Sequence, residues 1–100
     1  MFKVGDWVRE YDKYSDNVNV VQIDEHLLFD IENGRVYDTY ELWEPQKGEW
    51  CWFWDNTTKI PYLNQFMKMD RGLYQPKDSV MGFQYCEPFI GNLPSKYKGK

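Results

Sequence analysis

The sequence predicts an all-β protein built from two copies of one small unit. Three observations lead to this prediction. Several short segments alternate apolar and polar residues with the period of a strand. Aromatic residues, which strands favour, make up 19% of the 100 residues. The second half also repeats residues of the first at a constant spacing. We therefore expect repeats at 1–44 and 45–88, packed into one compact unit, and a C-terminal arm at 89–100.

The repeat rests on identities that recur 43 positions apart. They begin with a glycine and a tryptophan near the start of each half and end with a Glu-Pro pair. So many identities at one spacing indicate an internal duplication. The matched residues are Gly5 with Gly48, Trp7 with Trp50, Asp12 with Asp55, Gln22 with Gln65, and Glu44-Pro45 with Glu87-Pro88.

The first half is expected to contain five short strands joined by turns. A tight Gly5-Asp6 turn leads into the first strand, and polar turn formers at 12–17 follow it. Asn33-Gly34 is the strongest hairpin signal, because both residues tolerate the positive φ of a type I′ turn. The expected strands are residues 7–11, 18–23, 27–32, 35–37 and 40–43.

The second half is expected to follow the same plan. Residues 62–69 are ambiguous alone, because their apolar side chains also fit helical spacing. Their counterpart in the first half, residues 19–24, has a clear strand pattern, so we predict a strand. The expected strands are 50–54, 62–69, 73–75 and 80–86, followed by an extended arm at 89–94 and a frayed basic tail at 95–100.

Charge is distributed unevenly between the halves. Residues 1–44 hold eleven acidic and four basic residues, a net charge of −7, and residues 45–100 hold five acidic and eight basic residues, a net charge of +3. The asymmetry can steer an anion to the second half, can let the halves of two copies associate, or can be a surface bias without a role. The overall charge of −4 argues against duplex nucleic acid as a partner.

The expected compartment is the cytoplasm, with no membrane association. The chain has no run of 18 apolar residues, and its first residues do not resemble a secretory signal. Cys51 and Cys86 are therefore expected to be reduced thiols with a packing role. Two cysteines 35 positions apart without accompanying histidines form no zinc pattern. We expect neither a metal nor a cofactor.

The sequence offers no catalytic constellation, so no enzymatic activity is expected. His26 is the single histidine, and it lies beside Asp24 and Glu25 in a predicted turn. Such a histidine can act as a general base, but a solvated loop residue is the better explanation. Neither cysteine has the basic neighbours that lower a thiol pKa. Phosphate-binding loops and nucleophile motifs are absent from the sequence.

The densest feature of the sequence is the aromatic strand at residues 50–54. Alternation sends Cys51 and Phe53 toward the core and the three tryptophans to the opposite face. These tryptophans correspond in the repeat to Trp7, Arg9 and Tyr11. The face either packs between the repeats or under the arm, or it stays open to stack a planar ligand or bind a protein. The candidate binding residues are Trp50, Trp52, Trp54, Trp7, Arg9, Tyr11, Lys59, Lys68 and Arg71.

The repeat comparison assigns different roles to these tryptophans. Trp50 recurs as Trp7 and is expected to be architectural. Trp52 stands where the first repeat has Arg9 and is expected to carry function. The three basic residues of the second half are expected to lie near the indoles and to attract an anionic group.

The first half carries the pattern Phe-x-Val-Gly-Asp-x-Val at residues 2–8, followed by a β-branched strand and the Asn-Gly turn. This pattern resembles the small SH3-like barrels of the KOW and Tudor groups, and it implies two tandem SH3-like barrels. The motif at 48–55 and residues 86–94 resemble small uncharacterised proteins of bacteriophages and prophages.

Together these features predict a non-enzymatic binding module encoded by a phage or mobile element. It is expected to engage a host protein or to sequester a small anionic nucleotide through the aromatic face, and counter-defence is the use that the resemblance implies. The alternative is a structural or assembly protein that self-associates into an oligomer through its acidic and basic halves.

Overall fold

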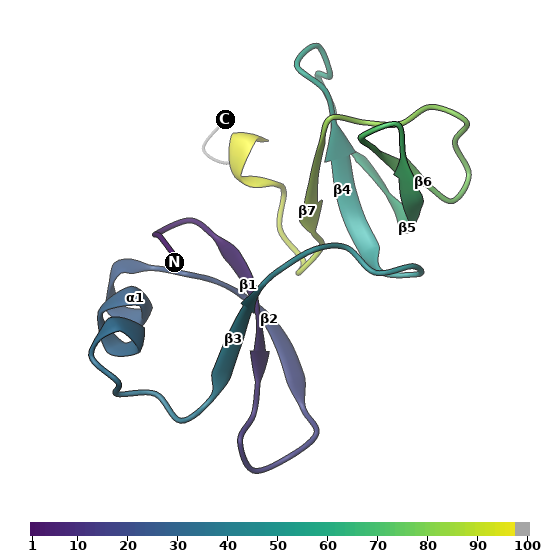
Figure 1. Ribbon diagram of the computed structural model, residues 1–100. Helices are drawn as coiled ribbons and strands as arrows, with labels where there is room; N and C mark the ends of the chain where they lie inside the picture. The colour runs from purple at the N-terminus through teal and green to yellow at the C-terminus, as the bar shows by residue number, and fades with distance from the viewer. Residues whose placement is uncertain (98–100) are drawn as a thin grey trace. The chain divides into compact units, whose positions relative to one another are not determined.

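The computed structural model describes residues 1–97 of the chain (Figure 1). The chain divides into two compact units, Met1–Glu44 and Pro45–Lys100, which we describe one at a time. The described residues form seven strands, one short α-helix and a single 3-10 turn, so the prediction of a mostly β chain is confirmed. No helix in the described part has the length and apolarity needed to span a membrane. The last three residues of the predicted basic tail, 98–100, lie outside the described residues.

The first unit is a three-stranded antiparallel sheet with one helix. Its strands are arranged in the order β2-β1-β3, so β1 forms the centre. Val8 of β1 and Ile23, just after β2, are almost completely buried and form its core. The elements are β1 (Trp7–Tyr11), β2 (Val18–Gln22), α1 (Glu25–Glu32) and β3 (Thr39–Leu42).

The second unit is a four-stranded antiparallel sheet in the order β6-β5-β4-β7. The aromatic strand β4 lies in its interior, between β5 and β7. Cys51 and Phe53 of β4 are completely buried, as the alternation of the sequence predicts, and Phe66 of β5 packs into the same core. The elements are β4 (Trp50–Trp54), β5 (Tyr62–Asp70), β6 (Leu73–Pro76), β7 (Tyr85–Pro88) and the 3-10 turn η1 (Ser95–Tyr97).

Neither sheet closes into a barrel, so two tandem SH3-like barrels are not confirmed. In the second unit, Tyr74 of β6 pairs with Phe83 as an isolated bridge, and this pair does not extend into a ladder. The strand predicted over 80–86 begins only at Tyr85. The segment before Phe83 lies very close to β6. Gly82 makes this possible, because a Cβ at its position would lie 2.5 Å from the Cβ of Leu73.

The entry turn and first two strands of the two units share the same hydrogen bonds. In the first unit, the Gly5 N–H donates to the Ile23 carbonyl and the Ile23 N–H donates to the Asp6 carbonyl, each at 2.8 Å. The same two bonds, at the same lengths, recur in the second unit between Gly48, Glu49 and Phe66. Each of these residues lies 43 positions after its counterpart.

A glutamine side chain hydrogen-bonds to this turn in each unit. Gln22 lies opposite Trp7 in the sheet, and its Nε2 donates to the Gly5 carbonyl at 3.1 Å. Gln65 lies opposite Trp50, and its Nε2 donates to the Gly48 carbonyl at 3.0 Å. The identities at the start of the repeat therefore mark equivalent positions in three dimensions.

The Glu-Pro pair at the end of the repeat does not mark equivalent positions. The N–H of Trp43 donates to the Trp7 carbonyl at 2.8 Å, and the N–H of Phe89 donates to the Trp50 carbonyl at 3.1 Å. Phe89 is therefore the counterpart of Trp43, at a spacing of 46 rather than 43. Alignment of Glu44-Pro45 with Glu87-Pro88 is wrong by three positions.

The predicted hairpin around Asn33-Gly34 is also wrong, because residues Glu25–Glu32 form α1. Asp24 begins the helix: its carboxylate accepts a hydrogen bond from the Leu27 N–H at 2.8 Å, as an N-cap residue does. Asn33 ends the helix, and Gly34 follows with φ +67°, a conformation that favours glycine at this place. The Asn-Gly pair thus stops a helix here instead of turning a hairpin.

The shared turn gives a direct test of the repeat. Gly5 and Gly48 have φ of +96° and +90°, and no atom lies within 4 Å of an added Cβ, so alanine meets conformational strain without a clash. We expect Gly5→Ala and Gly48→Ala to lower the free energy of unfolding by about 1–2 kcal/mol each, measured by urea denaturation. Gly48→Asn is the control and should cost less, because asparagine tolerates positive φ. An unchanged free energy in Gly48→Ala would contradict the assignment.

Candidate functional site

The face of the second sheet that carries the three tryptophans is the candidate site. Trp50, Trp52 and Trp54 alternate with the buried Cys51 and Phe53 along β4, as predicted. The face is not uniformly open, because Trp54 is only 6% exposed. The C-terminal arm accounts for this difference, since it crosses the sheet on this side.

Trp52 is tied to the arm by two contacts. Its Nε1 donates to the Asn92 carbonyl at 2.6 Å. Its ring meets the Phe89 ring edge-on, with centroids 5.7 Å apart. Indole N–H groups that are partly buried normally find such a partner. Trp52, expected to be the functional residue, thus serves as an anchor for the arm.

Trp54 is enclosed by two tyrosines. Its ring stacks on Tyr85 of β7 with an interplanar angle of 21° and meets Tyr97 of η1 edge-on. The Tyr97 hydroxyl donates to the Thr58 carbonyl at 2.7 Å, which fixes η1 against this end of the sheet. Packing under the arm, one of the three alternatives for this face, therefore describes Trp52 and Trp54.

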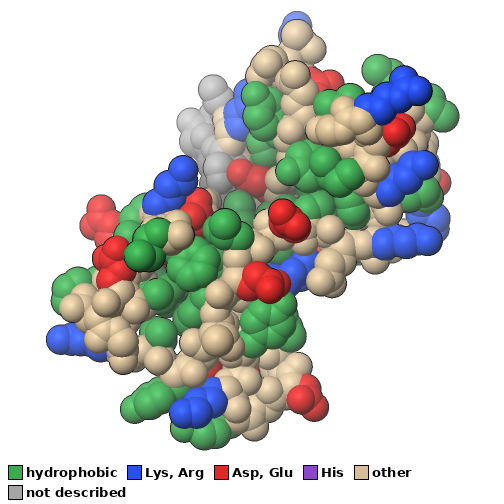
Figure 2. All heavy atoms as spheres, viewed as in Figure 1, with side chains coloured by type: hydrophobic (Ala, Val, Ile, Leu, Met, Phe, Trp, Pro, Cys, Tyr) green, Lys and Arg blue, Asp and Glu red, His purple; other side chains and the backbone are tan. Residues whose placement is uncertain are grey.

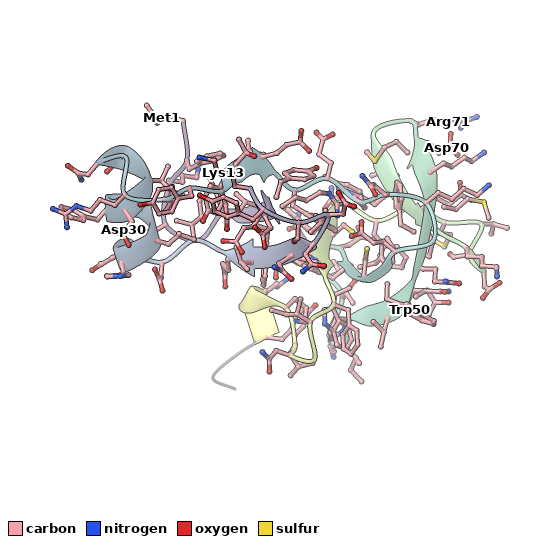
Figure 3. The ribbon with its side chains drawn as sticks, turned by 90° about the horizontal axis from the view of Figure 1, so that it is seen from below. Met1, Lys13, Asp30, Trp50, Asp70 and Arg71 are labelled. Atoms are coloured by element: carbon pink, nitrogen blue, oxygen red, sulfur yellow. The ribbon has the colours of Figure 1, made fainter. Side chains whose placement is uncertain are left out.

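Trp50 is the tryptophan that remains open, with 52% of its surface exposed. It begins β4, and its side chain lies at the outside of the second unit (Figure 3). Leu63 lies opposite Trp52 in the ladder and is 37% exposed, and Phe89, which hydrogen-bonds to Trp50 through its backbone, is 40% exposed. We call Trp50, Trp52, Leu63 and Phe89 the Trp50 patch.

The three candidates of the first unit are engaged within that unit. Arg9 is only 7% exposed, donates from its guanidinium to the Glu44 carbonyl at 2.7 Å, and lies over the Trp43 ring. The Tyr11 hydroxyl donates to Glu41 at 3.0 Å, a bond that raises the pKa of Tyr11. Trp7 is partly buried at the start of β1. These side chains support the first sheet.

The predicted basic residues of the second half do not gather around Trp50. Arg71 lies in the turn after β5, at the end of the unit away from Trp50 (Figure 3). Gln65, the partner of Trp50, is six residues earlier on the strand, which corresponds to roughly 20 Å. Lys68 lies about half as far along. Lys59 follows the opposite end of β4, in the loop before β5.

Two other lysines lie beside Gln65, the ladder partner of Trp50. A hollow of about 200 Å³ borders Gln65, and exposed Lys47 and Lys77 stand on its sides. The Lys77 N–H donates to the Gln65 carbonyl at 2.8 Å, which brings the segment after β6 to this place. In the sequence, Lys47 could have been noticed as a candidate because it precedes the repeated Gly48, whereas no sequence pattern indicates Lys77. The hollow is lined by Lys47, Gly48, Gln65, Phe66, Met67 and Lys77.

The titratable groups outside this face have structural surroundings. Cys86 of β7 is hydrogen-bonded to Cys51, and this bond together with burial raises the pKa of the Cys86 thiol. His26 lies in the first turn of α1 rather than in the predicted turn, 3.2 Å from Asp30. Within residues 1–97, no three His, Cys, Asp or Glu side chains lie close enough together to hold a metal ion.

Comparisons with known proteins do not assign the chain to a family. Neither protein-family models, nor curated proteins, nor solved structures gave a match. The resemblances to SH3-like barrels and to phage proteins stay predictions. A functional conclusion therefore has to come from the chemistry of the Trp50 patch.

Proposed function

We propose that the chain is a non-enzymatic module that binds a protein partner through the Trp50 patch. The observation that carries the proposal is the open, half-exposed indole of Trp50 on a regular strand, with exposed Leu63 and Phe89 on the same face. Clustered exposed apolar side chains mark interaction surfaces, and tryptophan is prominent among the residues that dominate binding energy. The ladder of β4 with β5 holds these side chains in place before binding.

A protein partner fits this surface better than a small nucleotide. Pockets for small ligands usually enclose about 300–1,000 Å³, whereas the hollow beside Trp50 measures about 200 Å³. Trp52 and Trp54, the indoles expected to stack a base, are covered by the arm. The resemblance to phage-encoded proteins makes a host protein the expected partner and counter-defence the expected use.

A second copy of the chain is the alternative partner, in line with the structural or assembly role. The charges of −7 and +3 on residues 1–44 and 45–100 favour contact between unlike halves of two copies. Sedimentation at low and high salt separates the two functions. Assembly through charge requires an oligomer that dissociates as salt rises, and a monomer in both conditions excludes it.

The patch can be tested with a displayed library of random peptides selected against the folded protein. We expect the selected peptides to bind at least about 30-fold more weakly to Trp50→Ala, because a central tryptophan is worth about 2 kcal/mol or more. Ile60→Ala is the matched control, since Ile60 is an apolar residue of the same unit that is 82% exposed and lies outside the patch. Peptides that bind Trp50→Ala as well as the native protein would refute the proposed function.

A further inference from the structure

The hollow that borders Gln65, the ladder partner of Trp50, gives the patch a cationic side. Gln65 connects the two features: it pairs with Trp50 across the ladder, its Nε2 bonds to the Gly48 carbonyl, and its own carbonyl accepts from the Lys77 N–H. Lys47, adjacent to Gly48, and Lys77 are thereby held on the β5 side of Trp50.

Among residues 1–97, the two lysines have no ion-pair partner. In the described part of the chain, neither ammonium group has a salt bridge or a hydrogen bond, and both residues are exposed. The carboxylate of the neighbouring Glu49 already accepts a hydrogen bond from the Gln46 N–H at 2.8 Å. Glu87 lies opposite Trp52 on β7, on the other side of β4 from the hollow.

The patch therefore has a direction. Apolar side chains occupy its middle, Lys47 and Lys77 lie on the β5 side, and Glu87 lies on the β7 side. Figure 2 shows Lys and Arg side chains gathered over the side of the second unit that carries β5 and β6. A partner that covers Trp50 must also cover or approach these cations, and like charges there would oppose binding.

We infer that the Trp50 patch binds an acidic segment of its partner, with an apolar side chain on Trp50 and carboxylates beside Lys47 and Lys77. The inference rests on the proposed function and adds the chemical class of the partner segment. Complementary charge sets the orientation of such a segment and speeds its association, while the indole supplies most of the affinity.

The library selection described above provides the test. We expect the selected peptides to carry net negative charge with at least one large apolar residue, and to bind more weakly as salt rises. Lys47→Glu combined with Lys77→Glu should weaken their binding by about 5- to 30-fold, because exposed ion pairs are individually modest. Lys59→Glu combined with Arg71→Glu is the matched control, because it lowers the net charge equally but lies away from Trp50; it should change binding less than about 3-fold.

The outcomes separate the inference from the proposed function. Neutral or basic peptides that depend on Trp50 but not on Lys47 and Lys77 would overturn the inference and leave the proposed function standing. Peptides that bind equally well to the native protein and to Trp50→Ala would refute both the proposed function and the inference. Adenosine monophosphate tests the small-ligand alternative: if it displaces the peptides and quenches the tryptophan fluorescence of the native protein but not of Trp50→Ala, the hollow is a nucleotide site and the inference fails.

Discussion

Phe53→Ala is expected to unfold the second unit under conditions in which the native chain is folded. Phe53 is completely buried on the central strand β4 and packs against Phe83, with ring centroids 6.0 Å apart. Removing a buried phenylalanine ring costs about 3–5 kcal/mol. A unit the size of residues 45–100 buries little surface in total, so a loss of this magnitude is comparable to its whole stability.

Denaturation followed by tryptophan fluorescence and by far-ultraviolet circular dichroism measures this effect. Phe29→Ala is the matched control, because Phe29 lies half-exposed on α1 and the same atoms are removed from its surface. We expect the control to lower the free energy of unfolding by about 1–2 kcal/mol, clearly less than Phe53→Ala, because half of the Phe29 side chain is already exposed and only its contact with Arg35 is lost. A loss below about 1 kcal/mol for Phe53→Ala would show that Phe53 does not lie in a packed core.

Ending the chain after Gly91 is expected to produce the second large effect. This truncation removes the Asn92 carbonyl from Trp52 and the Tyr97 ring from Trp54. Tryptophan emission should move to longer wavelength as both indoles gain water. Two lost aromatic or hydrogen-bonding contacts and the newly exposed indole surface correspond to about 2–4 kcal/mol of stability.

A point substitution keeps this prediction testable if the truncated chain does not fold. Tyr97→Ala removes the contact with Trp54 and the hydrogen bond to Thr58 but leaves the arm in place. Tyr14→Ala, at a tyrosine that is 78% exposed in the first unit, is the control and should leave both emission and stability unchanged. Emission that stays the same after truncation and after Tyr97→Ala would contradict the position of the arm.

The aromatic strand β4 of the second unit was predictable because its side chains alternate between the core and the opposite face. Cys51 and Phe53 are buried and flanked by tryptophans, which is the pattern of a strand with one core face. The repeat also resolved Tyr62–Asp70 correctly as a strand, although its local spacing fits a helix. Hydrogen bonds around Gly5 and Gly48 explain why the comparison works there: the turn places the following strands in the same register.

The helix α1 is not predicted from the sequence because the Asn33-Gly34 dipeptide fits two different structures. Asn-Gly favours positive φ, and both a type I′ hairpin and a helix C-terminus use that conformation. The deciding evidence lies upstream, where Asp24 caps the helix through the Leu27 N–H, and Leu27, Leu28 and Ile31 repeat at helical spacing. A two-residue turn signal therefore does not decide a structure without the pattern of the segments beside it.

The sequence does not predict which of the three tryptophans of β4 is exposed to solvent. Alternation correctly places Trp50, Trp52 and Trp54 on one face, but the path of the arm decides which of them stay open. That path depends on contacts formed in three dimensions, such as Trp52 with Asn92. The same limit applies to Lys77, which lies 27 positions after Trp50 in the sequence. Only its backbone hydrogen bond to Gln65, the ladder partner of Trp50, marks it as a candidate binding residue.

The equivalence of Trp7 and Trp50 has a consequence for how the two units use one position of a shared turn. Both residues start the first strand of their unit, next to the same glycine turn and glutamine. Trp7 is partly buried with its indole nitrogen shielded from solvent, whereas half of Trp50 faces water. The same position is therefore a packing residue in the first unit and a surface residue in the second, although the turn beside it is shared. Substitutions near Trp50, including at Lys47, should therefore change what the patch binds while the turn and the ladder that hold the indole stay the same.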